Sequence, residues 1–191
     1  MPRIEIAPYS AAWPKEFQRL AGKIRSALGE RALRIDHIGS TAVPGLDAKD
    51  RIDIQVTVAS LDDANPLGAA GFEEFSAHPD GQRDHRPPGA DGPDEDWTKR
   101  LFNTPSTEKK ANVHVRVANR ANQRYALLFR DYLRTHPAAV EAYAELKRRL
   151  AAELRNVGVY ADVKDPACDL IIVAAEDWAE ATGWEPGPSD A

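Results

Sequence analysis

The sequence predicts an α+β protein, in which a β-sheet with flanking helices is followed by a helical segment. Alternating apolar and polar residues, typical of strands with one buried face, mark several stretches of residues 1–118. Residues 119–191 instead carry apolar stripes at helical spacing. No linker-like stretch separates the two parts, so we expect residues 119–191 to pack on the core as part of one continuous domain.

A short alternating segment at residues 3–6 is predicted as a strand, and an amphipathic helix follows it. Ser10 is a candidate N-cap, Pro14 suits a first turn, and Gly29 stands where a C-cap glycine is common. The apolar positions between them recur at helical spacing: Phe17, Leu20, Ala21, Ile24 and Leu28.

Two strands are predicted next. Residues 32–38 form the first, which runs into a turn at Gly39, and residues 51–58 form the second, which has a clear period of two. The polar face of the second strand carries Asp53 and Gln55. Its apolar face carries Ile52, Ile54, Val56 and Val58.

The rest of the core is predicted from turn signals and further alternation. Ser60 can cap a short helix that reaches Ala70, and an extended piece begins at Gly71. Residues 78–96, rich in Pro, Gly, Asp and His, are predicted as an exposed loop, whose basic residues have acidic neighbours typical of a solvated surface. Residues 97–103 and 111–118 are the last two predicted strands.

Three helices are predicted after residue 118. The segment 135–137 separates the first two, a start at Asp165–Pro166 is predicted for the third, and Gly183 ends it. Their apolar stripes comprise Tyr125, Leu128, Phe129, Tyr132 and Leu133, then Val140, Tyr143, Leu146, Leu150 and Leu154, then Leu170, Ile171, Ala174 and Trp178.

Composition excludes several classes of function. The 25 Lys and Arg against 30 Asp and Glu give a net charge of −5, which argues against a nucleic-acid-binding protein. The longest strongly apolar run, 170–175, is too short to span a membrane, and residues 1–5 lack the apolar stretch of a signal peptide. The single cysteine, Cys168, excludes an internal disulfide and is expected to be a small core residue. We therefore expect a cytoplasmic protein.

The strand–turn–strand unit around Gly39 carries the clearest chemistry. A glycine at a strand end lets the backbone approach a ligand, and Ser40 offers a hydroxyl and N–H groups to a phosphate. Asp53 on the neighbouring strand could hold a Mg²⁺ ion that bridges phosphate oxygens. The alternative is a structural turn beside a solvated strand face. No Gly-x-x-x-x-Gly-Lys-Ser/Thr loop is present, so a P-loop kinase is not expected.

Other polar residues extend this candidate site. His114 and Arg116 share the polar face of a strand that could pair beside Asp53, where Arg116 suits a phosphate and His114 a proton transfer or a metal. The alternative is an ordinary exposed sheet face. In the helical part, basic residues either point back to the ligand or form surface ion pairs: Arg130, Lys147 and Lys164.

The motifs together resemble the GrpB family, which is assigned to the nucleotidyltransferase-like superfamily. The resemblance rests on the string from His37 to Leu46, on Ala48–Lys49 and on Ile52–Ile54. It extends to Tyr9–Phe17, Val113–Val115, Leu128–Arg134, Tyr143, Leu146–Lys147, Tyr160 and Lys164. It implies a nucleotidyltransferase-like mixed sheet with helices over residues 1–118 and a helical segment over 119–191.

The resemblance also implies an activity, Mg-dependent transfer of a nucleotidyl group from a nucleoside triphosphate to an unknown acceptor. Asp53 would hold the metal, with His114 as a second ligand or as a base. The triphosphate would be bound or neutralised by Gly39, Ser40, Thr41, Lys49, Arg116 and Arg130.

One departure from that superfamily favours a second interpretation. Where nucleotidyltransferases place a second carboxylate, this chain has Gln55, so a two-metal site would be short of charge. Residues 36–184 are also similar to the module appended to the kinase domain of some bacterial dephospho-CoA kinases. The alternative is therefore a non-catalytic nucleotide- or phosphate-binding module, related to CoA for example, that regulates or assists a partner protein.

Overall fold

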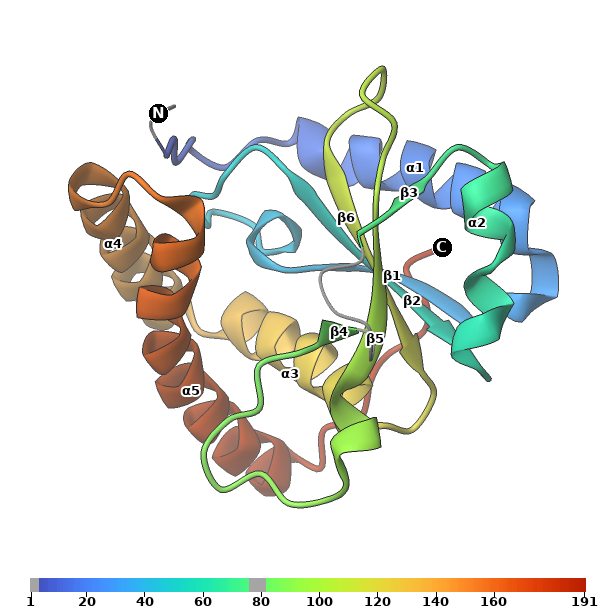
Figure 1. Ribbon diagram of the computed structural model, residues 1–191. Coiled ribbons are helices and arrows are strands. Elements are labelled where there is room, and N and C mark those ends of the chain that lie inside the picture. Colours follow the sequence, from blue (N-terminus) through green and yellow to red (C-terminus); the bar gives the residue numbers. More distant parts are fainter. Residues whose placement is uncertain (1–3, 76–81) are drawn as a thin grey trace.

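The computed structural model describes residues 4–75 and 82–191 and shows a mixed six-stranded sheet with helices on both faces (Figure 1). The sheet order is β1-β2-β6-β5-β3, with β4 paired to β5. β2 and β6 run parallel, and the other neighbours are antiparallel. The strands are β1 (Arg34–Ile38), β2 (Ile52–Val58), β3 (Glu73–Glu74), β4 (Gln82–Arg83), β5 (Thr98–Asn103) and β6 (Ala111–Val117). The expected α+β fold, with a helical segment at the end, is confirmed.

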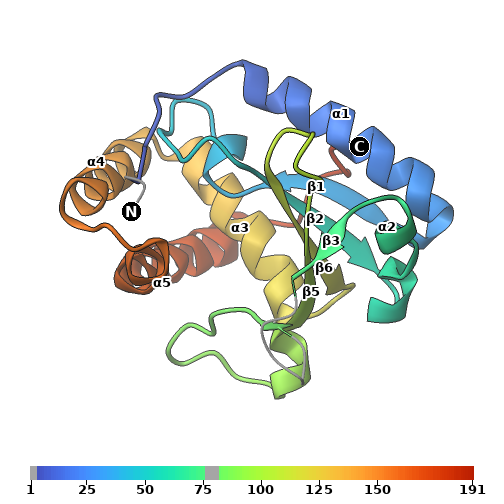
Figure 2. The ribbon, with the colours of Figure 1, turned by 45° about the horizontal axis from the view of Figure 1, so that its top comes forward.

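Helices α1 and α3 lie on opposite faces of the sheet (Figure 2). The apolar face of β2 packs under α1, whose Phe17, Leu20 and Ile24 are almost fully buried. The polar face of β2 is turned toward α3, because Gln55 donates a hydrogen bond to the carbonyl of Gln123. The helices are α1 (Ala12–Leu28), α2 (Pro66–Ala69), α3 (Ala121–Thr135), α4 (Pro137–Glu153) and α5 (Val157–Thr182). None of the helices in the described part of the chain is both long and apolar enough to cross a membrane.

The last three helices form a layer that is joined to the sheet by a second core. Val43 and Leu46, from the connection between β1 and β2, pack with Leu133 of α3 and with Val140 and Tyr143 of α4. This connection leaves β1 at Gly39 and returns to β2 at Ile52. Its apolar residues therefore anchor the segment that contains the predicted phosphate turn.

The predicted start of the last helix at Pro166 is wrong. The helix α5 begins at Val157, where the side chain of Asn156 accepts hydrogen bonds from the N–H groups of Gly158 and Val159. Proline removes only one backbone donor, and the buried face of α5 continues on both sides of it. That face comprises Tyr160, Cys168, Ile172, Ala175 and Ala179.

Two other expectations need correction. Ile4–Ile6 form no strand, and only Ala7 forms a bridge, to Ala48; residues 1–3 lie outside the described part. Within the predicted exposed loop 78–96, residues 82–83 form β4 and Asp84 is mostly buried, while residues 78–81 are not described. Asp84 is buried because its carboxylate forms ion pairs with Lys99 and Arg116 of the sheet.

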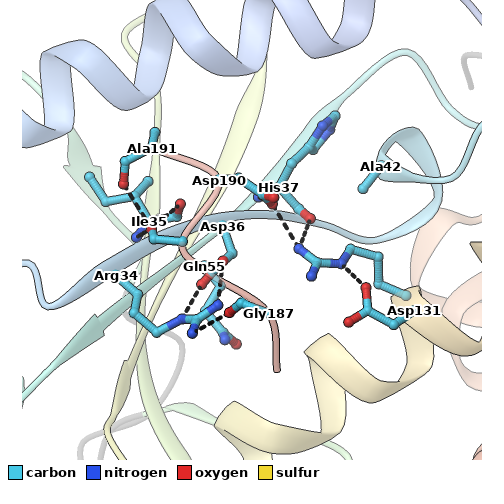
Figure 3. A network of polar contacts seen from close by, with 12 residues as sticks. Arg34, Ile35, Asp36, His37, Ala42, Gln55, Asp131, Gly187, Asp190 and Ala191 are labelled. Carbon is cyan, nitrogen blue, oxygen red and sulfur yellow. Dashed lines mark hydrogen bonds and ion pairs between the residues drawn. The ribbon is translucent and has the colours of Figure 1, made fainter. Parts of the chain in front are cut away.

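The C-terminal residues run along β1, the first strand of the sheet order (Figure 3). Ala191 donates its N–H to the carbonyl of Ile35 (3.1 Å), and the Ser189 hydroxyl accepts from the N–H of Ile35 (2.9 Å). The carboxylate of Asp190 accepts from the N–H of His37 (2.9 Å). This tail therefore satisfies backbone groups that an edge strand would otherwise expose.

Candidate functional site

A cavity of about 470 Å³ lies between the polar face of the sheet and the last three helices. Its wall is formed by the turn after β1, by β2, β5 and β6, and by α3, α4 and α5. Seven of the residues predicted for the site line it: Gly39, Ser40, Thr41, Lys49, Asp53, His114 and Arg116. The parallel pairing of β2 with β6 brings Asp53 and His114 together, because Gln55 and His114 are register partners.

The turn at Gly39 is shaped by its contact with Asp53. Gly39 has a φ of 67°, and a Cβ at this position would stand 2.6 Å from Asp53 Oδ2. Among described residues, no hydrogen bond uses the backbone N–H of Ser40 or of Thr41. Both residues line the cavity, which makes their N–H groups candidate donors to an anion.

Asp53 is the carboxylate beside this turn. Its Oδ1 accepts a hydrogen bond from the Asn112 side chain (2.7 Å) and lies 3.6 Å from Nε2 of His114. Burial opposes ionisation, but the contacts with His114 and Asn112 and the charge of Lys49 outweigh it and hold the pKa of Asp53 below its usual value. Asp53 is therefore a carboxylate at neutral pH.

His114 is neutral at the same pH. Burial, and next the charge of Lys99, lower the pKa of His114 to about 4. Lys99 donates to Nδ1 of the imidazole (3.3 Å), which leaves the ring proton on Nε2, facing Asp53. In this arrangement His114 orients Asp53 and offers no lone pair toward it.

Arg116 is committed to protein partners. It donates to both carboxylate oxygens of Asp84 (2.8 and 2.9 Å) and to Oε1 of Gln55 (2.7 Å). Lys99 and Asn122 also donate to Asp84. Burial opposes ionisation of Asp84, but the charges of Arg116 and Lys99 hold its pKa well below the usual range. No sequence pattern predicted this role of Asp84, because the residue lies in a polar stretch without periodicity.

Arg130, the eighth predicted residue, lies outside the residues that line the cavity. Its guanidinium is almost fully buried and donates to Asp131 (2.7 Å), to Asp190 (2.7 Å) and to the carbonyl of His37 (3.1 Å). Arg130 thus joins α3 and the C-terminal tail to the strand that ends at Gly39.

The cavity wall is basic although the chain carries a net charge of −5. Its cationic side chains are Lys49, Arg51, Lys99, Arg116, Lys147 and Lys164, and its carboxylates are Asp53, Asp84 and Asp165. With Asp84 already paired, the balance of charge favours an anionic ligand.

The residues fit one Mg²⁺ ion and do not fit two. Asp53 supplies a single ionised carboxylate beside the turn at Gly39. Mg²⁺ is commonly bound by one or two carboxylates together with phosphate oxygens and waters. The second position, Gln55, is neutral, fully buried and bonded to Arg116 and Gln123. In the part of the chain that the structure describes, no group of three or more His, Cys, Asp or Glu side chains is placed to hold a metal.

Fold and site together define a mixed α/β protein whose cavity is lined by more cations than carboxylates. The sequence model of the GrpB family, described as "GrpB protein", matches residues 3–173. The crystal structure of conserved protein GrpB from Enterococcus faecalis has a TM-score of 0.72 and 27% identity, covering 91% of this chain and 99% of that one. The chain therefore belongs to the GrpB family.

Two further similarities concern longer proteins. A dephospho-CoA kinase from Mycolicibacterium paratuberculosis is 38% identical over 199 residues, which is 96% of this chain and 48% of that protein. The chain thus spans about half the length of that relative. A structure of Cid1 in complex with its short product ApU has a TM-score of 0.45 and 16% identity, covering 74% of this chain and 42% of that one.

Proposed function

We propose that the protein binds a nucleotide or another phosphorylated small molecule in the cavity, as a binding or regulatory module. The observation that carries this proposal is the turn at Gly39: the residues that follow it, Ser40 and Thr41, line a cavity with more cations than carboxylates, and their N–H groups make no hydrogen bond with a described residue. Backbone donors next to uncompensated positive charge are what a phosphate group requires.

Each residue near the turn has a distinct part in this binding. Ser40 and Thr41 donate to phosphate oxygens, and Lys49 supplies charge from the connection that leads to β2. Asp53 holds one Mg²⁺ ion, which neutralises phosphate charge when it is bound. His114 keeps the Asp53 carboxylate oriented through its Nε2 proton. Arg51 supports the same site indirectly, because it donates to Asn112, which donates to Asp53.

Nucleotidyl transfer to an unknown acceptor is the second candidate. The pair of Asp53 and His114 beside the turn favours it, because a metal-holding carboxylate next to an imidazole suits phosphoryl chemistry. The neutral Gln55 weighs against it, since the second metal then has no carboxylate. Binding without turnover therefore ranks first.

The kinase relative suggests the class of ligand and the way in which the module acts. That protein is named a dephospho-CoA kinase, and it is about twice as long as the part that this chain matches. We infer that a CoA-like nucleotide is among the ligands to test, and that the bound module acts on a partner protein in the cytoplasm.

Calorimetric titration tests the proposal. ATP, CTP, GTP, UTP and CoA are titrated into the protein with and without Mg²⁺, and into Asp53→Asn and Asp177→Asn variants. Asp177 is exposed on α5 and serves as the matched control. We expect Mg²⁺-dependent binding that weakens at least about tenfold in Asp53→Asn and stays unchanged in Asp177→Asn. No binding of any probe would contradict the proposal, and release of pyrophosphate from a triphosphate would favour transfer.

A further inference from the structure

Three lysines gather at the helical end of the cavity, and two of them, Lys147 and Lys164, have no part in the turn at Gly39. Lys49 comes from the connection before β2, Lys147 from α4 and Lys164 from α5, and all three line the cavity. The Nζ of Lys49 lies 4.9 Å from the ring centroid of Tyr160, and the Nζ of Lys147 lies 4.7 Å from that of Tyr143. Long-range charge effects among the three show that they share one region.

Few negative groups compensate this lysine cluster. Lys49 makes no side-chain hydrogen bond or ion pair with a described residue. Lys147 donates to the backbone carbonyl of Asp47, whose carboxylate is paired with Arg148. Lys164 contacts Cys168 Sγ (3.0 Å) and has a carboxylate, that of Asp165, only at 3.9 Å. Among the described residues, the three amines therefore have fewer anionic partners than positive charges.

We propose that the ligand carries more than one anionic group and that the lysine cluster binds the second group, in a subsite separate from the turn at Gly39. Binding there is accompanied by uptake of a proton at Lys147. The inference rests on the proposed function, because it assigns the first anionic group to that turn.

Lys49 shows that the two subsites are neighbours. Burial is the largest cause that lowers the pKa of Lys49; the charge of Asp53 opposes this shift and that of Lys164 adds to it, so Lys49 lies within electrostatic reach of both. A cavity of about 470 Å³ has room for a ligand that spans both subsites. The anions are then either successive phosphates of one chain or two phosphates on different positions of a nucleoside.

Proton uptake follows from the surroundings of Lys147. Burial, and next the charge of Lys164, lower the pKa of Lys147 to about 7, so much of the amine is neutral at pH 8. An anion in contact with the amine favours the ammonium form and raises that pKa again. The titratable and charged groups that face Lys147 are Asp47, Lys49, Tyr143, Tyr160, Lys164 and Cys168.

The test compares anions of increasing charge. Phosphate, pyrophosphate, tripolyphosphate and adenosine 3′,5′-bisphosphate are titrated at pH 8 in two buffers of different ionisation enthalpy. In the wild type we expect at least one multiply charged probe to bind about tenfold or more tighter than phosphate, with proton uptake visible as a buffer-dependent heat. Tighter binding of tripolyphosphate would indicate successive phosphates of one chain. Tighter binding of adenosine 3′,5′-bisphosphate would indicate two phosphates on different positions of a nucleoside.

Variants locate the effect. Lys147→Met should reduce the preference for multiple charges to less than about threefold and abolish the proton uptake. Lys164→Met should also reduce the preference, and it should leave a smaller proton uptake, because it removes the charge that lowers the pKa of Lys147. Lys15→Met, at an exposed position of α1, is the matched control and should change neither. Circular dichroism verifies folding, and the half-buried Lys164 provides a test if Lys147→Met fails to fold.

The outcomes separate this inference from the proposed function. If phosphate binds and weakens in Asp53→Asn, but no probe with several charges binds tighter, the second subsite is wrong and the first stands. A preference that survives in both lysine variants also overturns the subsite. If none of the anions binds, the proposed function and this inference fail together.

Discussion

Gly39 and Asp53 are in such close contact that the carboxylate occupies the space of a Gly39 side chain, with Oδ2 2.6 Å from the position of a Cβ. The turn and the carboxylate therefore form one unit, although 14 positions separate them in the sequence. A ligand that contacts the N–H groups after Gly39 also meets Asp53.

Gly39→Ala should be destabilising, because it adds a clash with Asp53 to a strained positive φ of 67°. We expect the free energy of unfolding to fall by about 1–3 kcal/mol and phosphate binding to weaken. Urea denaturation measures the first effect. The same substitution at Gly22, in the middle of α1 with open space around it, should stabilise by about 0.5–1 kcal/mol. Equal effects at both positions would contradict the role of the contact.

Asp190→Asn should weaken the link between the tail and the strand that precedes the turn. The substitution leaves the almost fully buried Arg130 with Asp131 as its one carboxylate among the described residues. We expect a loss of about 1–3 kcal/mol, measured as a shift of the urea midpoint at constant slope. Asp177→Asn, on the exposed side of α5, should leave the midpoint unchanged. An unchanged midpoint in Asp190→Asn would show that the tail contributes no stability.

Acid should destabilise the protein first through its buried histidines. Burial is the largest cause that lowers the pKa of His37 and of His114 to about 4, so both stay neutral in the folded state while the unfolded chain takes up protons near pH 6.5. Stability is therefore full above pH 6.5 and falls as the pH drops toward 4. In His114→Gln this loss should shrink by about 2–3 kcal/mol, as measured by urea unfolding at successive pH values. An identical pH profile in the variant would argue against a neutral His114.

Below pH 4 the stability should depend on Asp84. Its pKa is depressed in the folded state, because the charges of Arg116 and Lys99 outweigh burial, so its contribution is present above about pH 4 and is lost as the pH falls below that value. Asp84→Asn leaves two buried cations without their carboxylate and should cost about 3–5 kcal/mol at pH 7. The variant should also show a flatter stability profile between pH 4 and pH 2. A profile parallel to that of the wild type would contradict the assignment.

Local sequence patterns predicted the strands of the sheet well, but they did not predict which residues surround the candidate site. The alternation of residues 51–58 places Ile54 and Asp53 on opposite faces, and the structure has them there. The start of α5 was predicted wrongly at Pro166. A proline removes one backbone donor from a helix, and this loss is outweighed by the buried face of α5, which continues on both sides of Pro166.

The partners of the charged residues could not be predicted in the same way. Arg116 and Arg130 have the same side chain, yet one lines the cavity and the other binds the tail. Their partners, Asp84 and Asp190, come from segments without periodicity, so only the tertiary fold selects them. From the sequence, Lys147 and Lys164 are candidates that could point toward the ligand. That the two lysines lie close together, with Lys147 buried, depends on how the helices pack and could not be predicted from the sequence.

The tail along β1 has a practical consequence for anyone who shortens this protein. The GrpB family model matches residues 3–173 and so ends inside α5, whereas the strand that leads into the turn is covered by residues 189–191. A version that ends at residue 173 would lose Ala175 and Ala179 from the buried face of α5 and would leave the edge of β1 uncovered. Such an edge invites pairing with another copy, so precipitation of the trimmed protein would report an uncovered strand rather than a failed binding site.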